Sequence, residues 1–181
     1  MERELVLRAM HGDEEAFDAL VGRIGDSMHS VARRILRDTN LAQDATQQAL
    51  LDAWRHLPAL RDPDRFEAWA HRLLVRACYA EAKRDRRQRG TLTLLRDEQS
   101  DPDSSARLAT RDQLDRGFRQ LSVEHRTVVV LVHYLGLTPA EAADRMGTPA
   151  GTARSRLHYA LLQLRSVFEA DARLAAARGT A

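Results

Sequence analysis

Apolar residues in the first half of the chain recur every three or four positions, with polar residues between them. The longest such series consists of Phe17, Leu20, Ile24, Met28, Val31 and Ile35. This spacing places them on one face of an α-helix, because a strand would alternate every second residue. The pattern predicts four helices, at roughly 2–11, 13–37, 40–57 and 63–88.

Residues that favour helix ends separate these four segments. Asp13 can cap the second helix, and Asp38-Thr39-Asn40 interrupts the chain before the third. Asp62-Pro63 offers a capping carboxylate followed by proline at the first helical position. A carboxylate can accept hydrogen bonds from the free N–H groups of a first turn, and proline lacks an N–H that would need a partner there.

The helical pattern stops after Arg89. The next residues, 90–105, are rich in aspartate and serine and show no sustained period, which indicates a flexible acidic linker. Thr110 can cap a further helix with an apolar stripe, and Ser122 the helix after it, which Gly136 ends. We therefore predict an all-α protein of two small helical domains, 1–89 and 110–181, joined by a flexible linker at 90–109.

The most informative motif begins at Thr138. Thr138 and Glu141 form a capping box around Pro139, and Gly147 ends the short helix that follows. Thr148-Pro149 begins another helix at once. Two helices joined by so tight a turn have the spacing of a helix-turn-helix.

The second helix of this motif divides into two faces. The inward face is predicted to hold Ala153, Leu157, Ala160, Leu161 and Leu164. The polar positions are Thr152, Arg154, Ser155, Arg156 and His158. A recognition helix needs this division, because its first turns enter the major groove with donors outward while its other face packs on the domain. A surface helical hairpin with solvated arginines is the alternative that the motif alone leaves open.

Composition narrows the class of protein. The chain has 181 residues, 44% hydrophobic and 30% charged, and its formal net charge is only +2. The net charge therefore indicates little about function, and the positions of the charged residues are more informative. The single cysteine, Cys78, excludes an internal disulfide and a multi-cysteine zinc site. No run of eighteen uncharged apolar residues occurs, so we predict a cytoplasmic protein without membrane insertion.

Motifs for enzyme chemistry are missing from the sequence. The seven histidines are scattered at His11, His29, His56, His71, His125, His133 and His158. They show no His-Glu-x-x-His spacing, and the chain has neither a phosphate-binding glycine loop nor a nucleophile elbow. We expect no catalytic residue, no metal, no cofactor and no small-molecule substrate.

The second half resembles the promoter-recognition domain of extracytoplasmic-function sigma factors. The similarity runs over Leu121, Arg126, Gly136-Leu137-Thr138, Glu141-Ala142-Ala143 and Gly151-Thr152-Ala153-Arg154-Ser155-Arg156-Leu157. The resemblance implies that the recognition helix reads the minus-thirty-five promoter element. The contacts implied are Thr152, Arg154, Ser155, Arg156, His158 and Tyr159. Tyr159 departs from the family, which commonly has arginine there.

The first half resembles the other domain of the same family. The segment 42–54, Ala-Gln-Asp-Ala-Thr-Gln-Gln-Ala-Leu-Leu-Asp-Ala-Trp, is similar to its polymerase-binding helix, which implies that Asp44, Gln47 and Gln48 dock on the largest core subunit. Leu50, Trp54 and Leu57 have the spacing of a buried stripe, and we expect Trp54 in the core.

The segment from Phe66-Glu67-Ala68-Trp69 to Lys83-Arg84-Asp85-Arg86-Arg87 resembles the helix that captures the melted minus-ten strand. Single-stranded bases stack on aromatic rings and the backbone attracts cations. The residues implied are Phe66, Trp69, Arg72, Arg76, Lys83 and Arg84. Arg76 stands where the family often has asparagine. Without this resemblance, the basic run would be a solvated helix end, and both aromatic residues would belong to the core.

The resemblance covers roughly residues 5–168 and implies a sigma factor that binds core RNA polymerase and directs transcription initiation at specific promoters. Its implied partners are core RNA polymerase, promoter DNA and an anti-sigma factor. The acidic stretch Asp97 to Asp103 would thread the RNA exit path. Two alternatives remain: a dimeric helix-turn-helix regulator, which binds palindromic operators without polymerase, and a pure interaction module, which binds protein but no promoter.

Overall fold

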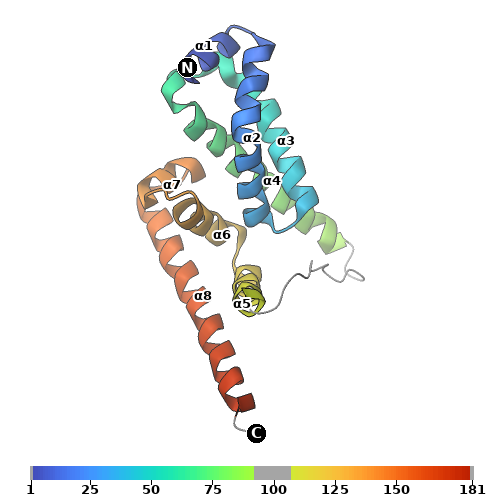
Figure 1. Cartoon of the computed structure of the whole chain (residues 1–181), viewed down its shortest axis with the longest axis vertical. Coiled ribbons are helices and arrows are strands. Elements are labelled where there is room, and N and C mark those ends of the chain that lie inside the picture. The colour runs from blue at the N-terminus through green and yellow to red at the C-terminus, as the bar shows by residue number, and fades with distance from the viewer. Residues whose placement is uncertain (1, 92–106, 180–181) are drawn as a thin grey trace.

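The computed structural model describes residues 2–91 and 107–179, and every regular element within these two ranges is helical. The N-terminal half consists of α1 (Glu2–Met10), α2 (Glu14–Leu36), α3 (Thr39–His56), the 3-10 turns η1 (Leu57–Ala59) and η2 (Pro63–Arg65), and α4 (Phe66–Thr91). The C-terminal half consists of α5 (Arg107–Gln120), α6 (Val123–Val129), a π-helical turn (Val130–Tyr134), α7 (Pro139–Met146) and α8 (Ala150–Gly179). Figure 1 shows the two halves one above the other. The all-α prediction is confirmed.

The helix starts of the N-terminal half follow the predicted caps. The carboxylates of Asp13 and Asp38 each accept a hydrogen bond of 3.0 Å from the backbone N–H three residues further on. Asp62 accepts one of 3.1 Å from the backbone N–H two residues further on, and this bond starts η2. A negative group at a helix N-terminus also complements the helix dipole.

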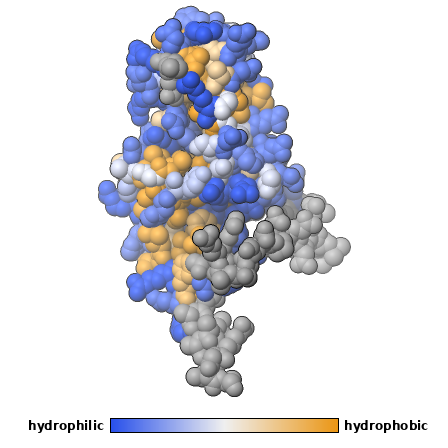
Figure 2. Space-filling model, viewed as in Figure 1, coloured by the Kyte–Doolittle hydropathy of each residue, from blue (hydrophilic) through white to orange (hydrophobic). Residues whose placement is uncertain are grey.

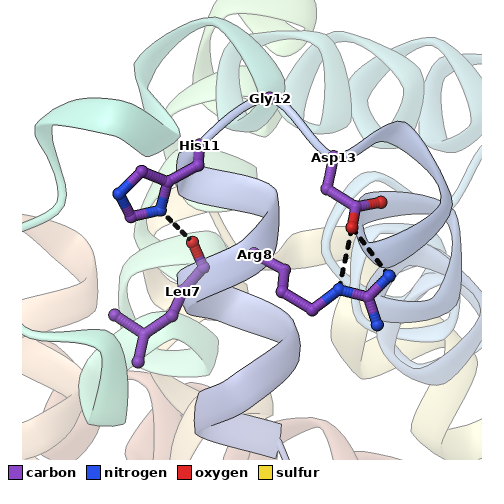
Figure 3. Close-up of a pocket in the computed structure, with 5 residues that line it drawn as sticks. All are labelled: Leu7, Arg8, His11, Gly12 and Asp13. Carbon is purple, nitrogen blue, oxygen red and sulfur yellow. Dashed lines mark hydrogen bonds and ion pairs between the residues drawn. The ribbon is translucent and has the colours of Figure 1, made fainter.

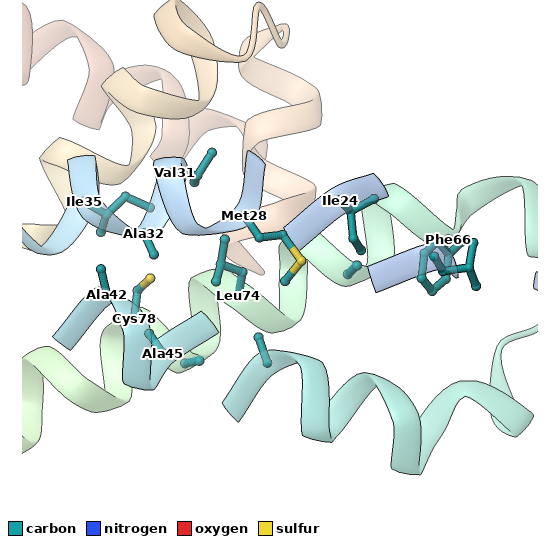
Figure 4. Packing of buried hydrophobic residues seen from close by; sticks show 14 of the residues in the cluster. Ile24, Met28, Val31, Ala32, Ile35, Ala42, Ala45, Phe66, Leu74 and Cys78 are labelled. Atoms are coloured by element: carbon teal, nitrogen blue, oxygen red, sulfur yellow. The ribbon is translucent and has the colours of Figure 1, made fainter. Parts of the chain in front are cut away.

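Helices α2, α3 and α4 enclose the core of the N-terminal half. Figure 4 shows Met28 and Ile35 of α2 near Ala42 of α3 and near Leu74 and Cys78 of α4, and all five side chains are fully buried. The buried face of α3 is built mainly from alanines, which let its backbone lie close to its neighbours. Its longer polar side chains are left to the outer face.

Helices α6, α7 and α8 form the core of the C-terminal half, with α5 packed along α8. Small residues make close approach possible here too, since Ala143, Ala153 and Ala160 are all buried. A Cβ on Gly117 of α5 would lie 2.7 Å from Cδ2 of Leu164 on α8. The two helices can meet this closely because Gly117 has no side chain.

Two details of the C-terminal half differ from the sequence prediction. Thr110 lies inside α5, which begins at Arg107, so the predicted cap at Thr110 is wrong. The helix predicted to run up to Gly136 changes from α-helical to π-helical geometry at Val130. Gly136 follows with φ +69°, the left-handed conformation expected of it.

The acidic stretch Asp97 to Asp103 lies outside the described residues. The predicted linker, 90–109, overlaps the last residues of α4 and the first residues of α5. No helix in the described ranges is both long enough and apolar enough to cross a membrane.

The two halves pack against each other. Val75 of α4 belongs to the apolar cluster of the C-terminal half, and Val123 and Val130 belong to that of the N-terminal half. The main contact joins α4 to α7, with additional contacts from α2 to α6 and to the π-helical turn. The core residues of each half are therefore completed by residues from the other.

Candidate nucleic-acid interface

Helix α3 presents Asp44, Gln47 and Gln48 together on one exposed face. They lie three and four residues apart, so they are neighbours on the helix surface. Nε2 of Gln48 donates a hydrogen bond of 3.0 Å to Oδ1 of Asp52, one turn further along. The face therefore offers a carboxylate and an amide that a partner protein can reach.

A groove of about 580 Å³ lies beside this face, between α2 and α3. Phe17, Leu50 and Trp54 contribute its apolar wall, and Asp18 and Gln47 lie among its polar residues. The groove could not be predicted from the hydrophobic pattern, because it depends on how two separate helices come together.

Trp54 is half-buried at the wall of this groove instead of lying in the core, so that prediction is wrong. Its ring packs on Phe17 of α2, with centroids 4.9 Å apart. Leu57 alone of the predicted stripe is completely buried, and Leu50 is half-buried.

A second shallow pocket, of about 450 Å³, lies at the turn between α1 and α2 (Figure 3). Nε of Arg8 donates to Oδ2 of Asp13 at 2.8 Å, and Nδ1 of His11 donates to the carbonyl oxygen of Leu7 at 2.7 Å. The backbone N–H of Ala16, followed by Arg8, lowers the pKa of Asp13. These polar groups already hold the turn together, and the pocket contains none of the predicted site residues.

Four of the six predicted minus-ten residues share one face of α4. Trp69, Arg72, Arg76 and Lys83 are spaced by three, four and seven residues, which aligns them along the helix. The three cationic residues are exposed, and Trp69 is half-buried. The helix thus combines an accessible aromatic ring with a row of positive charge.

The other two predicted residues lie away from that row. Phe66 is 2% exposed and packs in the core, with its ring centroid 6.2 Å from that of Trp69. Arg84 is exposed, and its Nη1 lies 3.0 Å from Oε1 of the buried Glu81. Phe66 therefore packs beside Trp69 from the core, and Arg84 already forms an ion pair with Glu81.

The predicted capping box and turn of the helix-turn-helix are present. The backbone N–H of Thr138 donates to Oε2 of Glu141 at 2.8 Å, and the N–H of Glu141 donates to Oγ1 of Thr138 at 3.3 Å. The side-chain hydrogen bond from Thr138 lowers the pKa of Glu141. Gly147 ends α7 in the left-handed conformation, with φ +62°, and α8 begins three residues later.

The first turns of α8 have the expected two faces. Ala153 and Ala160 are completely buried, whereas Arg154, Ser155, His158 and Tyr159 are exposed. Thr152 and Arg156 are half-buried at the edges of the exposed face. The structure therefore brings all six predicted minus-thirty-five residues to one end of one helix.

Local contacts within this face order its side chains. Oγ of Ser155 donates to the carbonyl oxygen of Thr152 at 3.0 Å, which leaves its lone pairs free to accept. The rings of His158 and Tyr159 meet edge to face, with centroids 5.6 Å apart. Arg154 has an exposed guanidinium with five donors, the group best suited to a guanine edge or a phosphate.

Leu161 does not face inward as predicted, because its side chain is 41% exposed. It and Leu162, which is 48% exposed, lie on α8 beyond the predicted DNA-contacting turns. Figure 2 shows apolar surface gathered over the C-terminal half, while the visible face of the N-terminal half is mostly hydrophilic. The inward face of α8 is narrower than its sequence suggested.

Metal-binding geometry does not occur in the described part of the chain, where no three histidine, cysteine, aspartate or glutamate side chains are grouped to hold an ion. Cys78 is buried, and burial raises its thiol pKa to about 12. The thiol is therefore protonated and unreactive at neutral pH.

Comparisons with known proteins match both halves in order. The family described as Sigma-70 region 2 matches residues 20–88, and the family described as Sigma-70, region 4 matches residues 117–166. The ECF RNA polymerase sigma factor SigM of Mycobacterium tuberculosis is 32% identical over 163 residues, which cover 90% of this chain and 82% of SigM.

Solved structures show the same arrangement of helices. CnrH, solved in complex with the cytosolic domain of CnrY, is 27% identical, with a TM-score of 0.66 over 94% of this chain and 98% of CnrH. The sigma factor RpoE of Bartonella quintana, solved with the anti-sigma factor NepR, is 20% identical, with a TM-score of 0.69 over 86% of this chain and 98% of RpoE. The second likeness concerns the fold alone.

Proposed function

The chain belongs to the extracytoplasmic-function sigma factors of RNA polymerase, and from that premise we propose which of its surfaces performs each step of promoter recognition. Members of this family are transcription initiation factors and not enzymes. The protein binds core RNA polymerase and directs it to specific promoters.

We assign the minus-thirty-five element to the unit 110–181. One observation carries the assignment: the first turns of α8 expose Arg154, Ser155, His158 and Tyr159 while Ala153 and Ala160 anchor the helix from behind. A helix held in this way can enter the major groove with its donors forward. Thr152 and Arg156, at the edges of this face, are placed to contact the flanking phosphates.

We assign recognition of the minus-ten element to the unit 1–89. Trp69 can stack on an unstacked base, and Arg72, Arg76 and Lys83 follow the strand's phosphates along α4. Arg84 joins this row once its contact with Glu81 is exchanged for a phosphate. Phe66 acts by positioning Trp69, because its own ring is buried.

Core polymerase binds the exposed face of α3, where Asp44, Gln47 and Gln48 lie. The enzyme then holds the two DNA-reading units at the separation of the two promoter elements. Tethering makes the second DNA contact intramolecular, so two weak modules reach useful specificity together. The segment 90–109, which includes the end of α4 and the start of α5, connects the two units.

A protein that restrains the factor is a further proposed partner. CnrH, whose fold this chain shares at 27% identity, was solved with the cytosolic domain of CnrY. A protein with this fold is therefore known to bind a protein partner. This supports the proposal that an anti-sigma factor binds this chain. We place the protein in the cytoplasm, where its polymerase works.

The test uses the full chain with sigma-free core RNA polymerase. We expect the two to co-elute in size-exclusion chromatography and to give promoter-dependent run-off transcripts on a panel of genomic promoters. Changing Asp44→Arg should weaken binding to core by about tenfold or more, because a reversed charge would sit in the middle of the docking face.

The matched control is Glu169→Arg, which makes the same charge change on α8, at an exposed site far along the helix. It should leave core binding unchanged. Equal weakening by both substitutions would reject the assignment of α3. Failure of the parent chain to co-elute with core, or to support any promoter-dependent transcript, would reject the proposed function itself.

A further inference from the structure

An aromatic ring lies in the middle of the surface of α8 that the proposed function turns toward DNA. Tyr159 is 59% exposed, the largest exposed fraction among the large apolar side chains that the structure describes. It follows the exposed Ser155 by four residues, which makes the two side chains neighbours along the helix. In the proposed arrangement, the ring therefore enters the major groove together with Ser155.

The backbone that carries this ring is fixed from the other side of the helix. The next residue, Ala160, is completely buried, and so is Ala153 two turns earlier. Leu164, which is 7% exposed, continues the same inner face. Because this face is packed against the domain, the direction in which Tyr159 leaves the helix is set before DNA binds.

A neighbouring ring restrains the tyrosine further. The rings of His158 and Tyr159 have their centroids 5.6 Å apart and their planes inclined by 64°. Aromatic pairs favour this arrangement, because the positive edge of one ring meets the negative face of the other. The pair therefore limits the rotation of an exposed ring and presents a defined apolar surface.

The outer face of α8 divides into a row with nitrogen donors and a row without them. Arg154 and His158, four residues apart, form the first row. Thr152, Ser155 and Tyr159 form the second, with spacings of three and four residues. Each side chain of the second row has one hydroxyl and no other polar group. The second row thus contacts DNA without a cation.

The chemistry of tyrosine excludes the usual way of reading guanine at this position. Guanine presents two acceptors, O6 and N7, to the major groove, and a side chain with several donors, such as arginine, can bind both. The phenol of Tyr159 has a single O–H and cannot donate to both. The family commonly has arginine here, so the tyrosine changes which base this position of the helix can prefer.

An apolar ring in the major groove has one favoured partner among the four bases. Only thymine carries a C5-methyl group there, and apolar side chains contact it. The other three bases lack this methyl group, and a ring that covers their hydrogen-bonding atoms leaves those atoms without partners. The exposed and restrained ring of Tyr159 therefore matches thymine.

We propose that Tyr159, oriented by His158, is a specificity-determining residue that selects thymine at one position of the minus-thirty-five element through the C5-methyl group. This inference rests on the proposed role of α8 and deepens it by naming the base and the group that are read. Contacts to phosphate hold the helix in place but carry no sequence information, so the methyl contact adds discrimination that they cannot supply.

The experiment uses holoenzyme reconstituted from core polymerase and the full chain, at subsaturating concentration, on a promoter that the parent transcribes. Each thymine of the minus-thirty-five element, on either strand, is replaced in turn by deoxyuridine, which lacks only the methyl group. The measured quantity is the ratio of run-off transcript from the thymine template to that from the deoxyuridine template. Because each variant is its own reference, changes in folding or in core binding cancel in this ratio.

For the parent holoenzyme, the ratio should be about four at one thymine, as expected when one methyl group is removed from an apolar contact. Tyr159→Ala should bring this ratio to one, and Tyr159→Phe, which lacks only the hydroxyl, should keep it. Tyr159→Arg should also abolish it and favour guanine at the same position, because several donors are then present. Leu162→Ala, which removes an exposed apolar side chain three residues further along, should leave the ratio unchanged.

A parent holoenzyme without any methyl-sensitive thymine would overturn the proposal, and so would a ratio that Tyr159→Ala leaves intact. A ratio of one in Leu162→Ala would also overturn it, because the effect would not be specific to the ring. If Tyr159→Phe lowers transcription equally on all templates and brings the ratio to one, the hydroxyl makes the contact and the proposal is wrong.

Promoter-dependent transcription by the parent chain separates this inference from the proposed function. A parent that transcribes without a methyl-sensitive position refutes the thymine contact only. A parent that gives no promoter-dependent transcript refutes the proposed function, and the thymine contact is rejected with it.

Discussion

Arg154 is the residue on which promoter selection should depend most. It projects from the exposed side of α8, next to the completely buried Ala153, so the backbone beneath it is fixed while its guanidinium is free to reach a base. A donor presented from a rigid element discriminates better than one on a loop, because fewer conformations are lost on binding.

Arg154→Ala should lose about 1 to 3 kcal/mol of discrimination between the preferred minus-thirty-five sequence and its single-base variants. The measurement is run-off transcription by the reconstituted holoenzyme on matched promoters. Arg165→Ala, an exposed arginine on the same helix that pairs with Glu169 at 2.8 Å, is the control and should leave the preference intact. An unaltered preference in Arg154→Ala would exclude a base contact.

At the scale of elements, the turn between α7 and α8 fixes the angle at which the recognition helix is presented. The N–H of Gly147 donates to the carbonyl oxygen of Asp144 at 3.2 Å, and the N–H of Thr148 donates to that of Ala143 at 3.0 Å. These bonds require the left-handed conformation at Gly147, which a residue with a Cβ adopts only with strain.

Gly147→Ala should destabilise the folded chain by about 1 to 2 kcal/mol, the cost of a left-handed conformation in a residue with a side chain. Urea unfolding followed by circular dichroism gives the value. Gly151→Ala is the contrasting control, because that glycine has an ordinary helical position with nothing within 4 Å. It should be neutral or stabilise slightly, and equal destabilisation by both would contradict the role of the turn.

The helices could be predicted from the sequence because their signals are local. Asp13, Thr138 and Gly147 each mark a helix end through bonds within a few residues, and the structure forms those bonds. Trp54 could not be placed in the same way. Its degree of burial depends on Phe17, a residue 37 positions away, and an apolar spacing on one helix does not say which neighbour will cover it.

The candidate site was predictable for the same reason only where it lies on one helix. The exposed faces of α3 and α8 follow from helical spacing. The same spacing aligns four predicted residues along α4: Trp69, Arg72, Arg76 and Lys83. The ion pairs between the two halves were not predictable. Asp144 meets Arg65 and Arg72 only through the packing of the two halves, and the sequence separates these residues by about 70 positions or more.

At the scale of the whole molecule, His71 couples the stability of the folded chain to pH. It is 4% exposed, and Nδ1 donates to the carbonyl oxygen of Glu67 at 3.0 Å. Burial is the main cause that lowers its pKa from 6.5, and Arg145 of α7 adds to it, while the Glu67 carbonyl and carboxylate oppose it. The folded state therefore holds His71 neutral.

Because the folded pKa lies below the unfolded value, the unfolded chain binds more protons just below pH 6.5. The stabilisation from neutral His71 is complete above that pH and is lost as pH falls towards the folded pKa. We expect a lower free energy of unfolding at pH 5.5 than at pH 7.5 by urea titration. His71→Gln should reduce this difference, and the exposed His56→Gln should not. An identical pH dependence in all three proteins would disprove the coupling.

The π-helical turn Val130–Tyr134 has a consequence for aligning this chain with others. Leu135 donates to the carbonyl oxygen of Val130, five residues back, where an α-helix would join residues four apart. The π-helical turn thus contains one residue more than an α-helical turn would. A relative that lacks this residue would have its preceding helix rotated by about 100°. An alignment that closes the gap elsewhere would equate residues that face different sides of the helix, about 100° apart.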